Sequence, residues 1–214
     1  MPLNSIVVGV GGQGILTLTR VLASSAVARG VKALVSETHG MSQRGGSVIV
    51  HLRIGDDVYA PLIPEGDGHL LIGLELVEAV RYSYFVRDDS VIIVNRRVIP
   101  PSLPDAEVPT EDELLKYLRE LAGDNLVVLD ASAEAQKLGN PVGANMYVLG
   151  YVAGLLSRAG VVSIDSCRRE VGKIGKGRVR EANIKIFEKG LSEGIRCERI
   201  LKSICKASGV CRDS

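Results

Sequence analysis

The chain has 214 residues, of which 46% are hydrophobic and 24% are charged, and its formal net charge is +1. This composition excludes an intrinsically disordered chain and is typical of a globular protein with one large domain. No apolar run reaches the ~18–20 residues that a membrane helix needs, and the first residues lack the basic segment and cleavage site of a secretory signal. We therefore expect a cytoplasmic protein without a membrane anchor.

The charge is divided unevenly along the chain. From Asp165 onward there are 13 Lys and Arg against 7 Asp and Glu, whereas the preceding residues carry 13 basic and 18 acidic side chains. Such a basic segment either meets an acidic protein or an anionic ligand, or forms ordinary solvated helix faces, which is the favoured interpretation. Because aromatic residues make up only 4% of the chain, we expect no nucleic acid partner.

The four cysteines argue against a metal centre held by this chain alone. Cys167, Cys197, Cys205 and Cys211 do not form the compact Cys-x-x-Cys spacing of zinc and iron–sulfur sites, and the three histidines lie far upstream. A Cys205–Cys211 disulfide stays open as an alternative, although disulfides are rare in the cytosol.

The first part of the chain predicts a strand, a helix and a second strand. Residues 5–10 predict a fully buried strand, residues 15–29 show aliphatic side chains at helical spacing, and residues 31–37 predict another strand. Such units favour a parallel sheet with a right-handed crossover. The alternating apolar residues over 47–60, interrupted by a Gly-Asp-Asp turn, then predict a β-hairpin where a second crossover helix is expected.

The rest of the chain alternates between strands and helices. Thr110 followed by Glu113 is a capping box that begins a helix, and the proline-rich segment 98–109 before it is expected to be a surface excursion. Strands are predicted over 69–74, 90–95 and 125–130, and helices over 76–86, 110–121, 144–158, 175–191 and 195–207. The helix over 144–158 is rich in small residues that permit close packing, and the helix over 175–191 is expected to place Ile184, Phe187 and Leu191 on one side.

These elements together predict an α/β fold. We expect a Rossmann-like, mostly parallel sheet flanked by helices, with a β-hairpin insertion and a helical C-terminal extension. The domain is expected to cover residues 1–193, and the helical tail residues 194–214.

The stretch GVGGQGIL, residues 9–16, follows the first strand and opens the first helix. Gly9, Gly11 and Gly14 fit the G-x-G-x-x-G pattern, and Glu37 ends the second strand where a ribose-binding acid belongs in a dinucleotide site. The missing second crossover helix weakens this interpretation. In addition, a lone glycine fingerprint has many false positives. The simpler alternative is that the glycines allow a tight turn and close packing.

A second stretch, VSETHGMSQRGGSV over residues 35–48, gathers many functional groups at the predicted carboxyl end of a strand. Ligands bind at that edge in open α/β sheets. Arg44 could bind a carboxylate or phosphate through paired hydrogen bonds, and His39 could transfer a proton near neutral pH. The alternative, a loop satisfied by its own hydrogen bonds, is less favoured because seven polar side chains exceed what a turn needs.

Three segments carry a specific family resemblance. GVGGQGIL, SETHGMSQRGGSVIVHLRIGDDVYAPLIPEGDGHLLIGLE and ANIKIFEKG resemble the gamma-type domain of the 2-oxoacid:ferredoxin oxidoreductases, in order through most of residues 5–191. The THGM-Q-RGGS loop is more similar to the indolepyruvate (arylpyruvate) branch, in which this domain is the small (beta) subunit, than to the pyruvate branch.

The resemblance implies one subunit of a heteromeric enzyme that is inactive when isolated. Enzymes of this family decarboxylate a 2-oxo acid oxidatively, form the coenzyme A thioester and pass electrons to ferredoxin. Thiamine diphosphate, Mg and the iron–sulfur clusters are then expected in the large alpha subunit, with coenzyme A as co-substrate and no cofactor held by this chain alone.

No residue is assigned a catalytic role, but a set of candidates is expected to line the shared site or the subunit interface, with Arg44 as the anion contact. Asn145 could donate to the same edge or could simply lie near a helix start. The candidates are Gly9, Gly11, Gly12, Gln13, Gly14, Glu37, Thr38, His39, Gly40, Met41, Gln43, Arg44, Gly45, Gly46 and Asn145.

Three alternatives stay open at this point. The chain could be the gamma subunit of a pyruvate or branched-chain 2-oxoacid:ferredoxin oxidoreductase. It could be an NAD- or FAD-dependent oxidoreductase with a modified fold, which would bind its cofactor as an isolated chain. It could also be a non-catalytic subunit that only stabilises a partner.

Overall fold

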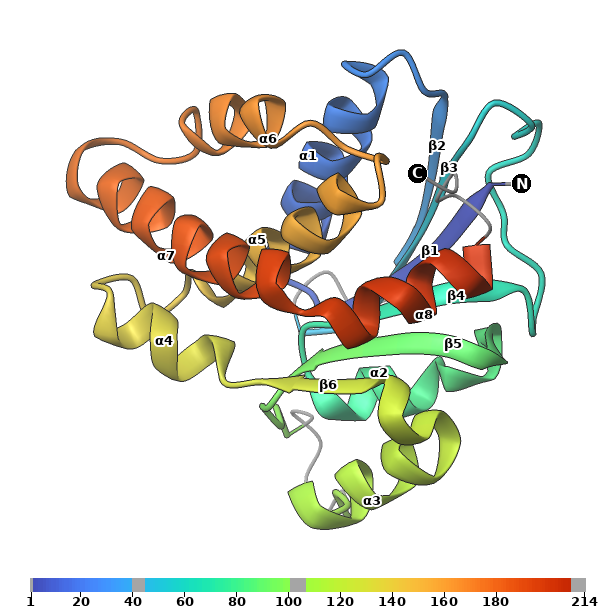
Figure 1. Cartoon of the computed structure of the whole chain (residues 1–214). Helices are drawn as coiled ribbons and strands as arrows, with labels where there is room; N and C mark the ends of the chain where they lie inside the picture. The colour runs from blue at the N-terminus through green and yellow to red at the C-terminus, as the bar shows by residue number, and fades with distance from the viewer. Residues whose placement is uncertain (1, 40–44, 101–106, 209–214) are drawn as a thin grey trace.

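The computed structural model describes residues 2–39, 45–100 and 107–208, and Figure 1 shows them arranged around one six-stranded sheet. The strand order is β2-β3-β1-β4-β5-β6. The strands are β1 (Leu3–Val10), β2 (Ala33–His39), β3 (Ser47–Ile54), β4 (Gly68–Gly73), β5 (Val86–Asn95) and β6 (Leu126–Leu129).

The sheet is mixed, and its direction changes beside β1. On one side β1, β4, β5 and β6 pair in parallel, whereas β3 lies antiparallel to β1 and to β2. The predicted strand–helix–strand unit is present, but β1 and β2 are parallel without being neighbours, because β3 lies between them. The α/β, Rossmann-like character of the chain is confirmed.

The predicted β-hairpin over 47–60 is wrong. Its first strand forms as β3, with Val7 of β1 opposite Val50 and Glu37 of β2 on the other side of the same residue, whereas residues 58–60 are not a strand. Strand β3 is buried along most of its length. It therefore finds partners within the sheet instead of folding back on its own continuation.

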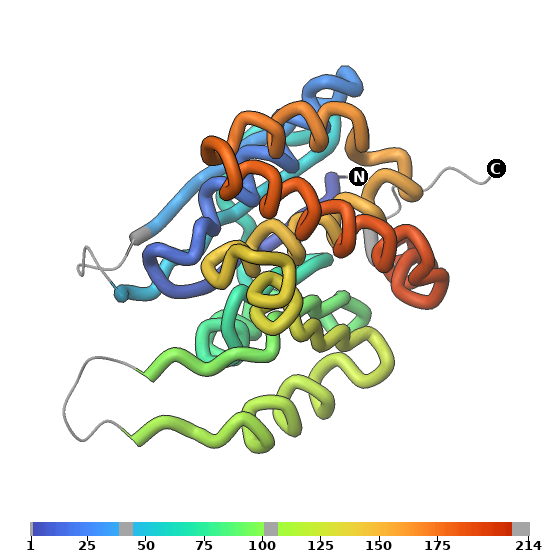
Figure 2. The backbone as a smooth tube through the Cα atoms, turned by 90° about the vertical axis from the view of Figure 1, so that its left-hand side faces the viewer, coloured from blue at the N-terminus to red at the C-terminus, as the bar shows by residue number. Residues whose placement is uncertain are grey.

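Helices cover both faces of the sheet (Figures 1 and 2). One face carries α1, α5, α6, α7 and α8 around the larger hydrophobic core, and the other carries α2 and α3 around a smaller one. The helices are α1 (Ile15–Val27), α2 (Leu76–Arg81), α3 (Glu111–Ala122), α4 (Ala131–Lys137), α5 (Ala144–Arg158), α6 (Ile164–Val171), α7 (Gly177–Arg196) and α8 (Glu198–Ser208). None of the described helices is long and apolar enough to span a bilayer.

Helices α5 and α7 pack unusually closely, backbone against backbone. A Cβ added to Gly154 would lie 2.7 Å from the carbonyl oxygen of Leu191, and one added to Gly150 or Gly190 would overlap the backbone of the facing helix. The small residues expected to permit close packing of this helix therefore do so. The predicted face of α7 is partly wrong, because Phe187 is buried but Ile184 is 38% exposed.

Several predicted element boundaries agree with the structure. Helix α5 has its predicted bounds, and the Thr110 capping box is present with both hydrogen bonds. The segment expected to be helical over 76–86 is instead α2 followed by a short 3₁₀ turn. The boundary expected between the domain and the helical tail, at residue 193, lies inside α7, and α8 contributes to the larger core. Residues 101–106 of the proline-rich segment and Cys211 lie outside the described residues.

Candidate functional site

The glycine turn lies at the carboxyl edge of the parallel strands, between β1 and α1. Gly12 and Gly14 have φ angles of 99° and 79°, a conformation that favours glycine. The N–H of Gly11 donates to the Gly46 carbonyl (2.8 Å), and the N–H of Gln13 donates to the Val10 carbonyl (3.1 Å). Two backbone amides of the turn are therefore already hydrogen-bonded within the chain.

The side chain of Gln13 locks the turn to the neighbouring strand end. Its Oε1 accepts the N–H of Val10 (2.8 Å), and its Nε2 donates to the carbonyl of Leu74, just after β4 (3.1 Å). A Cβ on Gly9 would lie 2.7 Å from the same Oε1. A larger residue at position 9 would therefore crowd the Gln13 side chain, a constraint that the glycine pattern alone did not show.

The second predicted loop begins on β2 and returns beside the glycine turn. Glu37 and Thr38 are exposed on β2, opposite Val50 and Ile49 of β3. The bond from Gly11 to Gly46 joins the two candidate segments directly. The candidates Gly40, Met41, Gln43 and Arg44 lie outside the described residues, as does the side chain of His39.

Asn145 joins the same edge from the start of α5. It is 9% exposed, and its Nδ2 donates to the Gly14 carbonyl (3.3 Å). A Cβ on Gly14 would overlap this amide. The structure therefore brings together Gly9, Gly11, Gly12, Gln13, Gly14, Gly45, Gly46 and Asn145.

A cavity of about 140 Å³ opens between the glycine turn and the starts of α4 and α5. Besides Gly12, Gln13 and Asn145 it is lined by residues that the sequence did not single out, namely Leu74, Arg97, Ile99, Ser132, Pro141, Val142 and Ala144. Leu74 lies just after β4, and Arg97 and Ile99 lie after β5. The remaining four residues come after β6 in the chain, and the carboxyl ends of these three strands meet at this edge. The general rule for open α/β sheets would have pointed to these positions.

The buried amide of Asn95 connects two residues that line this cavity. Asn95 is 0% exposed at the end of β5, and its Nδ2 donates to the Leu74 carbonyl (3.1 Å) and to Ser132 Oγ (3.0 Å). In return, the N–H of Ser132 donates to Asn95 Oδ1 (3.2 Å). One side chain thus fixes the ends of β4 and β5 relative to the start of α4.

On the opposite face of the sheet, a cavity of about 270 Å³ is lined by Val10, Gly45, Glu75, Val77, Glu78, Arg81, Ile99, Pro100, Glu107, Val108 and Pro109. Glu75 caps α2 by accepting the N–H groups of Val77 (3.0 Å) and Glu78 (2.5 Å), while burial raises the pKa of its carboxyl. Glu78 accepts hydrogen bonds from the Ser47 hydroxyl and from Nε of Arg81 (3.2 Å). Both buried carboxylates therefore serve the local structure.

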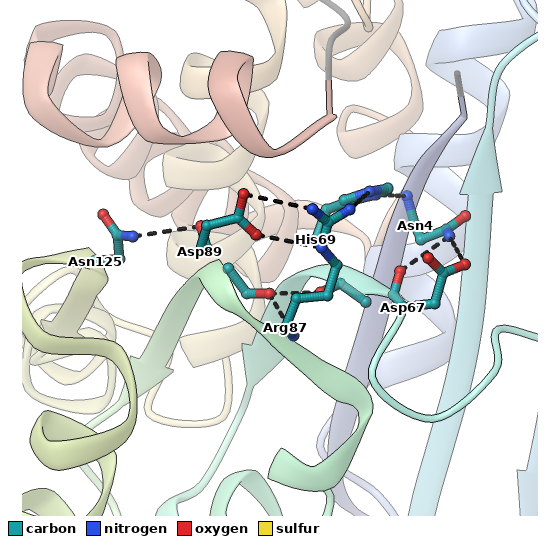
Figure 3. Close-up of polar contacts among 8 residues, drawn as sticks. Asn4, Asp67, His69, Arg87, Asp89 and Asn125 are labelled. Atoms are coloured by element: carbon teal, nitrogen blue, oxygen red, sulfur yellow. Dashed lines mark hydrogen bonds and ion pairs between the residues drawn. The ribbon is translucent and has the colours of Figure 1, made fainter.

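A second polar cluster lies at the other end of the sheet, away from the candidate site (Figure 3). Nδ1 of the buried His69 accepts the N–H of Asn4 (2.9 Å), so the neutral ring carries its proton on Nε2. That Nε2 lies 3.2 Å from NH1 of Arg87, which is also a donor. Burial, reinforced by the charge of Arg87, lowers the pKa of His69 below its usual value.

This arrangement predicts a loss of stability in mild acid. Burial also lowers the pKa of His51, so both rings stay neutral in the folded chain below pH 6.5, where the unfolded chain already binds protons. The free energy of unfolding should therefore fall as the pH drops below about 6.5, the ordinary pKa of histidine. Urea denaturation across this range measures it. The His69→Asn variant keeps an acceptor for Asn4, because its Oδ1 can take the place of Nδ1, and should show a shallower decline; an unchanged decline would contradict the assignment.

Among the described residues there is no group of three or more His, Cys, Asp or Glu side chains placed to hold a metal ion. Cys167 is buried, with its Sγ 3.1 Å from Ser25 Oγ, and burial raises the pKa of its thiol.

Comparisons with known proteins identify the family. Residues 4–193 match the family described as pyruvate ferredoxin/flavodoxin oxidoreductase. The indolepyruvate oxidoreductase subunit IorB of Archaeoglobus fulgidus is 40% identical over 91% of this chain and 96% of its own length, and that of Thermococcus kodakarensis is 37% identical over 88% and 94%. The pyruvate/ketoisovalerate oxidoreductases common subunit gamma of Thermococcus kodakarensis is 27% identical over 87% and 94%.

Solved structures show the same fold at low sequence identity. The pyruvate oxidoreductase subunit PORC of Thermotoga maritima matches with a TM-score of 0.66 at 18% identity, over 90% of this chain and 96% of that one. The gamma subunit of a keto/oxoacid ferredoxin oxidoreductase from Geobacter sulfurreducens matches with a TM-score of 0.63 at 22% identity, over 90% and 98%. With the sequence matches, the shared fold shows that this chain belongs to the pyruvate ferredoxin/flavodoxin oxidoreductase family.

Proposed function

We propose that this chain is the small subunit of a ferredoxin-dependent 2-oxoacid oxidoreductase that acts on indolepyruvate and related arylpyruvates. The observation that carries the proposal is the difference in identity between the two branches, 36–40% to the indolepyruvate subunits against 27–28% to the pyruvate/ketoisovalerate gamma subunits. Both kinds of relative match over most of this chain, so the difference does not come from partial coverage.

In this proposal the chain contributes the edge of the shared site, and its large alpha partner binds the redox cofactors. Thiamine diphosphate, Mg and the iron–sulfur clusters belong to the partner, coenzyme A is the co-substrate and ferredoxin accepts the electrons. The internal use of the Gly11 and Gln13 amides supports an edge role for the glycine turn. The small adjoining cavity supports it too, because sites for whole cofactors are commonly about 300–1,000 Å³.

Affinity purification from the native source tests this assignment. We expect a large subunit to co-purify and the complex to reduce ferredoxin with indolepyruvate and coenzyme A, faster than with pyruvate. The isolated chain should show no turnover. Turnover by the isolated chain, or a nicotinamide or flavin bound to it, would support the NAD- or FAD-dependent alternative and overturn the proposal.

Arg44 is the residue proposed to contact an anionic group of coenzyme A or of the oxo acid. Loss of one charged hydrogen-bonding partner weakens binding by about 1.5–3 kcal/mol, so Arg44→Ala in the reconstituted complex should raise the KM for one of these substrates at least about tenfold. Steady-state assays with each substrate varied in turn measure the effect. Unchanged constants in a complex that still assembles would remove this role and favour a purely stabilising subunit.

A further inference from the structure

We propose that the cavity beside the glycine turn is an oxyanion site, with Arg97 as its cationic contact and Ser132 and Asn145 as its polar walls. Its ligand group is a phosphate or a carboxylate. The proposal deepens the proposed function, on which it rests for the statement that this edge contacts substrates. It assigns the contact to residues on the α4–α5 side of the turn and not to Arg44.

Arg97 differs from its neighbour Arg96 in having a free head group. Arg96 is paired with Glu111, with 2.5 Å between Nε and Oε1, whereas the guanidinium of Arg97 is exposed and makes no ion pair or hydrogen bond with any residue that the structure describes. The backbone of Arg97 is nonetheless fixed, because its N–H donates to the Asn95 carbonyl and its own carbonyl accepts the N–H of Leu76, each at 2.8 Å. Arg97 is one of the residues that line the cavity.

Ser132 offers the cavity a second donor. Its Oγ accepts a hydrogen bond from Asn95 Nδ2 at 3.0 Å, so the hydroxyl hydrogen must point elsewhere. Ser132 lines the cavity, and no described residue accepts that hydrogen. A hydroxyl held in this way and a guanidinium together suit an oxyanion, because both can only donate towards it.

Asn145 adds a polar side chain to the wall of the cavity. It is more than nine-tenths buried and its Nδ2 is bound to the Gly14 carbonyl, but its Oδ1 receives no hydrogen bond from the described residues. This oxygen is not among the buried atoms that lack a partner, so it is open to solvent and can accept from water or from a ligand.

The surroundings strengthen the preference for an anion and limit its size. Helices α1 and α5 begin at the glycine N-caps Gly14 and Gly143, which no side chain caps, and neither helix has an acidic residue in its first turn. Their positive ends therefore face this edge without internal compensation. A volume of about 140 Å³ suits one anionic group, and Val142, 84% exposed at the rim, can contact the apolar body that carries it.

NMR titration of the full chain tests the site with two probes at constant ionic strength. Inorganic phosphate represents a phosphate ester, and phenyllactate represents a carboxylate with an adjacent hydroxyl on an apolar body. We expect saturable shifts of the backbone amides of Gly12, Gly14 and Asn145 with at least one probe. The probe that binds more tightly identifies the source of the oxyanion.

Arg97→Ala and Arg96→Ala form the matched pair for this experiment. Loss of a charged hydrogen-bonding partner should raise the dissociation constant at least about tenfold for Arg97→Ala, whereas Arg96→Ala should leave it within about twofold. Absence of saturable shifts with both probes, or equal weakening by the two variants, would overturn the proposal. Either outcome leaves the proposed function testable on its own, because co-purification with the large subunit does not depend on this site.

Discussion

Replacing Gly194 by alanine is expected to lower the free energy of unfolding by about 3 kcal/mol or more, at or beyond the upper end of the usual cost of overpacking. The added Cβ would overlap the carbonyl oxygen of Tyr151 on α5, which is backbone and cannot move aside. The two helices would have to separate along their whole seam. For a chain of this size the melting temperature should fall by roughly 6–12 °C.

Gly172→Ala is the matched control for this experiment. Gly172 ends α6 with φ −60°, and the nearest atom to its added Cβ is the Arg168 carbonyl oxygen of its own helix, 3.3 Å away. Such a substitution should be neutral or slightly stabilising, because alanine lowers the entropy of the unfolded chain. Equal stability of the Gly194 and Gly172 variants in urea denaturation would contradict the close packing of α5 against α7.

Replacing Asn95 by leucine is expected to cost about 2 kcal/mol. The change removes the three hydrogen bonds that join Asn95 to Leu74 and Ser132, each of which contributes about 0.5–1.5 kcal/mol. The Leu74 carbonyl keeps its bond from Gln13, which limits the loss. The start of α4, by contrast, loses the hydrogen bonds that join it to β5 through Asn95.

Ser132→Ala separates the contributions in a double-mutant cycle. This variant removes one of the three bonds and should cost about 1 kcal/mol. If Asn95 and Ser132 act together, the double variant should lose less than the sum of the single losses by at least about 0.5 kcal/mol. Strict additivity in urea denaturation would show that the two side chains contribute independently.

The parts of the fold that follow local patterns could be predicted from the sequence. The 144–158 helix and the Thr110 capping box depend on neighbouring residues, and both are present as expected. The prediction of a hairpin over 47–60 was wrong because the alternating pattern of a strand does not show which other strand it pairs with. Strand β3 pairs with the preceding strand β2 and, through residues 37–51 positions apart, with β1, and these contacts override the local turn signal.

The candidate site was predicted in part, and the omissions have a common cause. The glycine turn and Gly46 were chosen for their motifs, and the bond from Gly11 to Gly46 brings them together. Arg97, Ser132 and Asn95 carry no motif, and only the meeting of three strand ends makes them neighbours. Similarly, the opposition of His69 and Arg87 arises from tertiary pairing of β4 with β5 and has no counterpart in residue spacing.

The position of β1 inside the sheet affects how the chain emerges during synthesis. Ser5 pairs with Leu52 on one side and Leu70 on the other, so its second neighbour is made 65 residues later. At about 5–20 residues per second a ribosome needs roughly 3–13 s to make that stretch. For that interval the buried strand β1 has no complete set of partners, which makes the nascent chain a natural client for chaperones that bind extended hydrophobic segments.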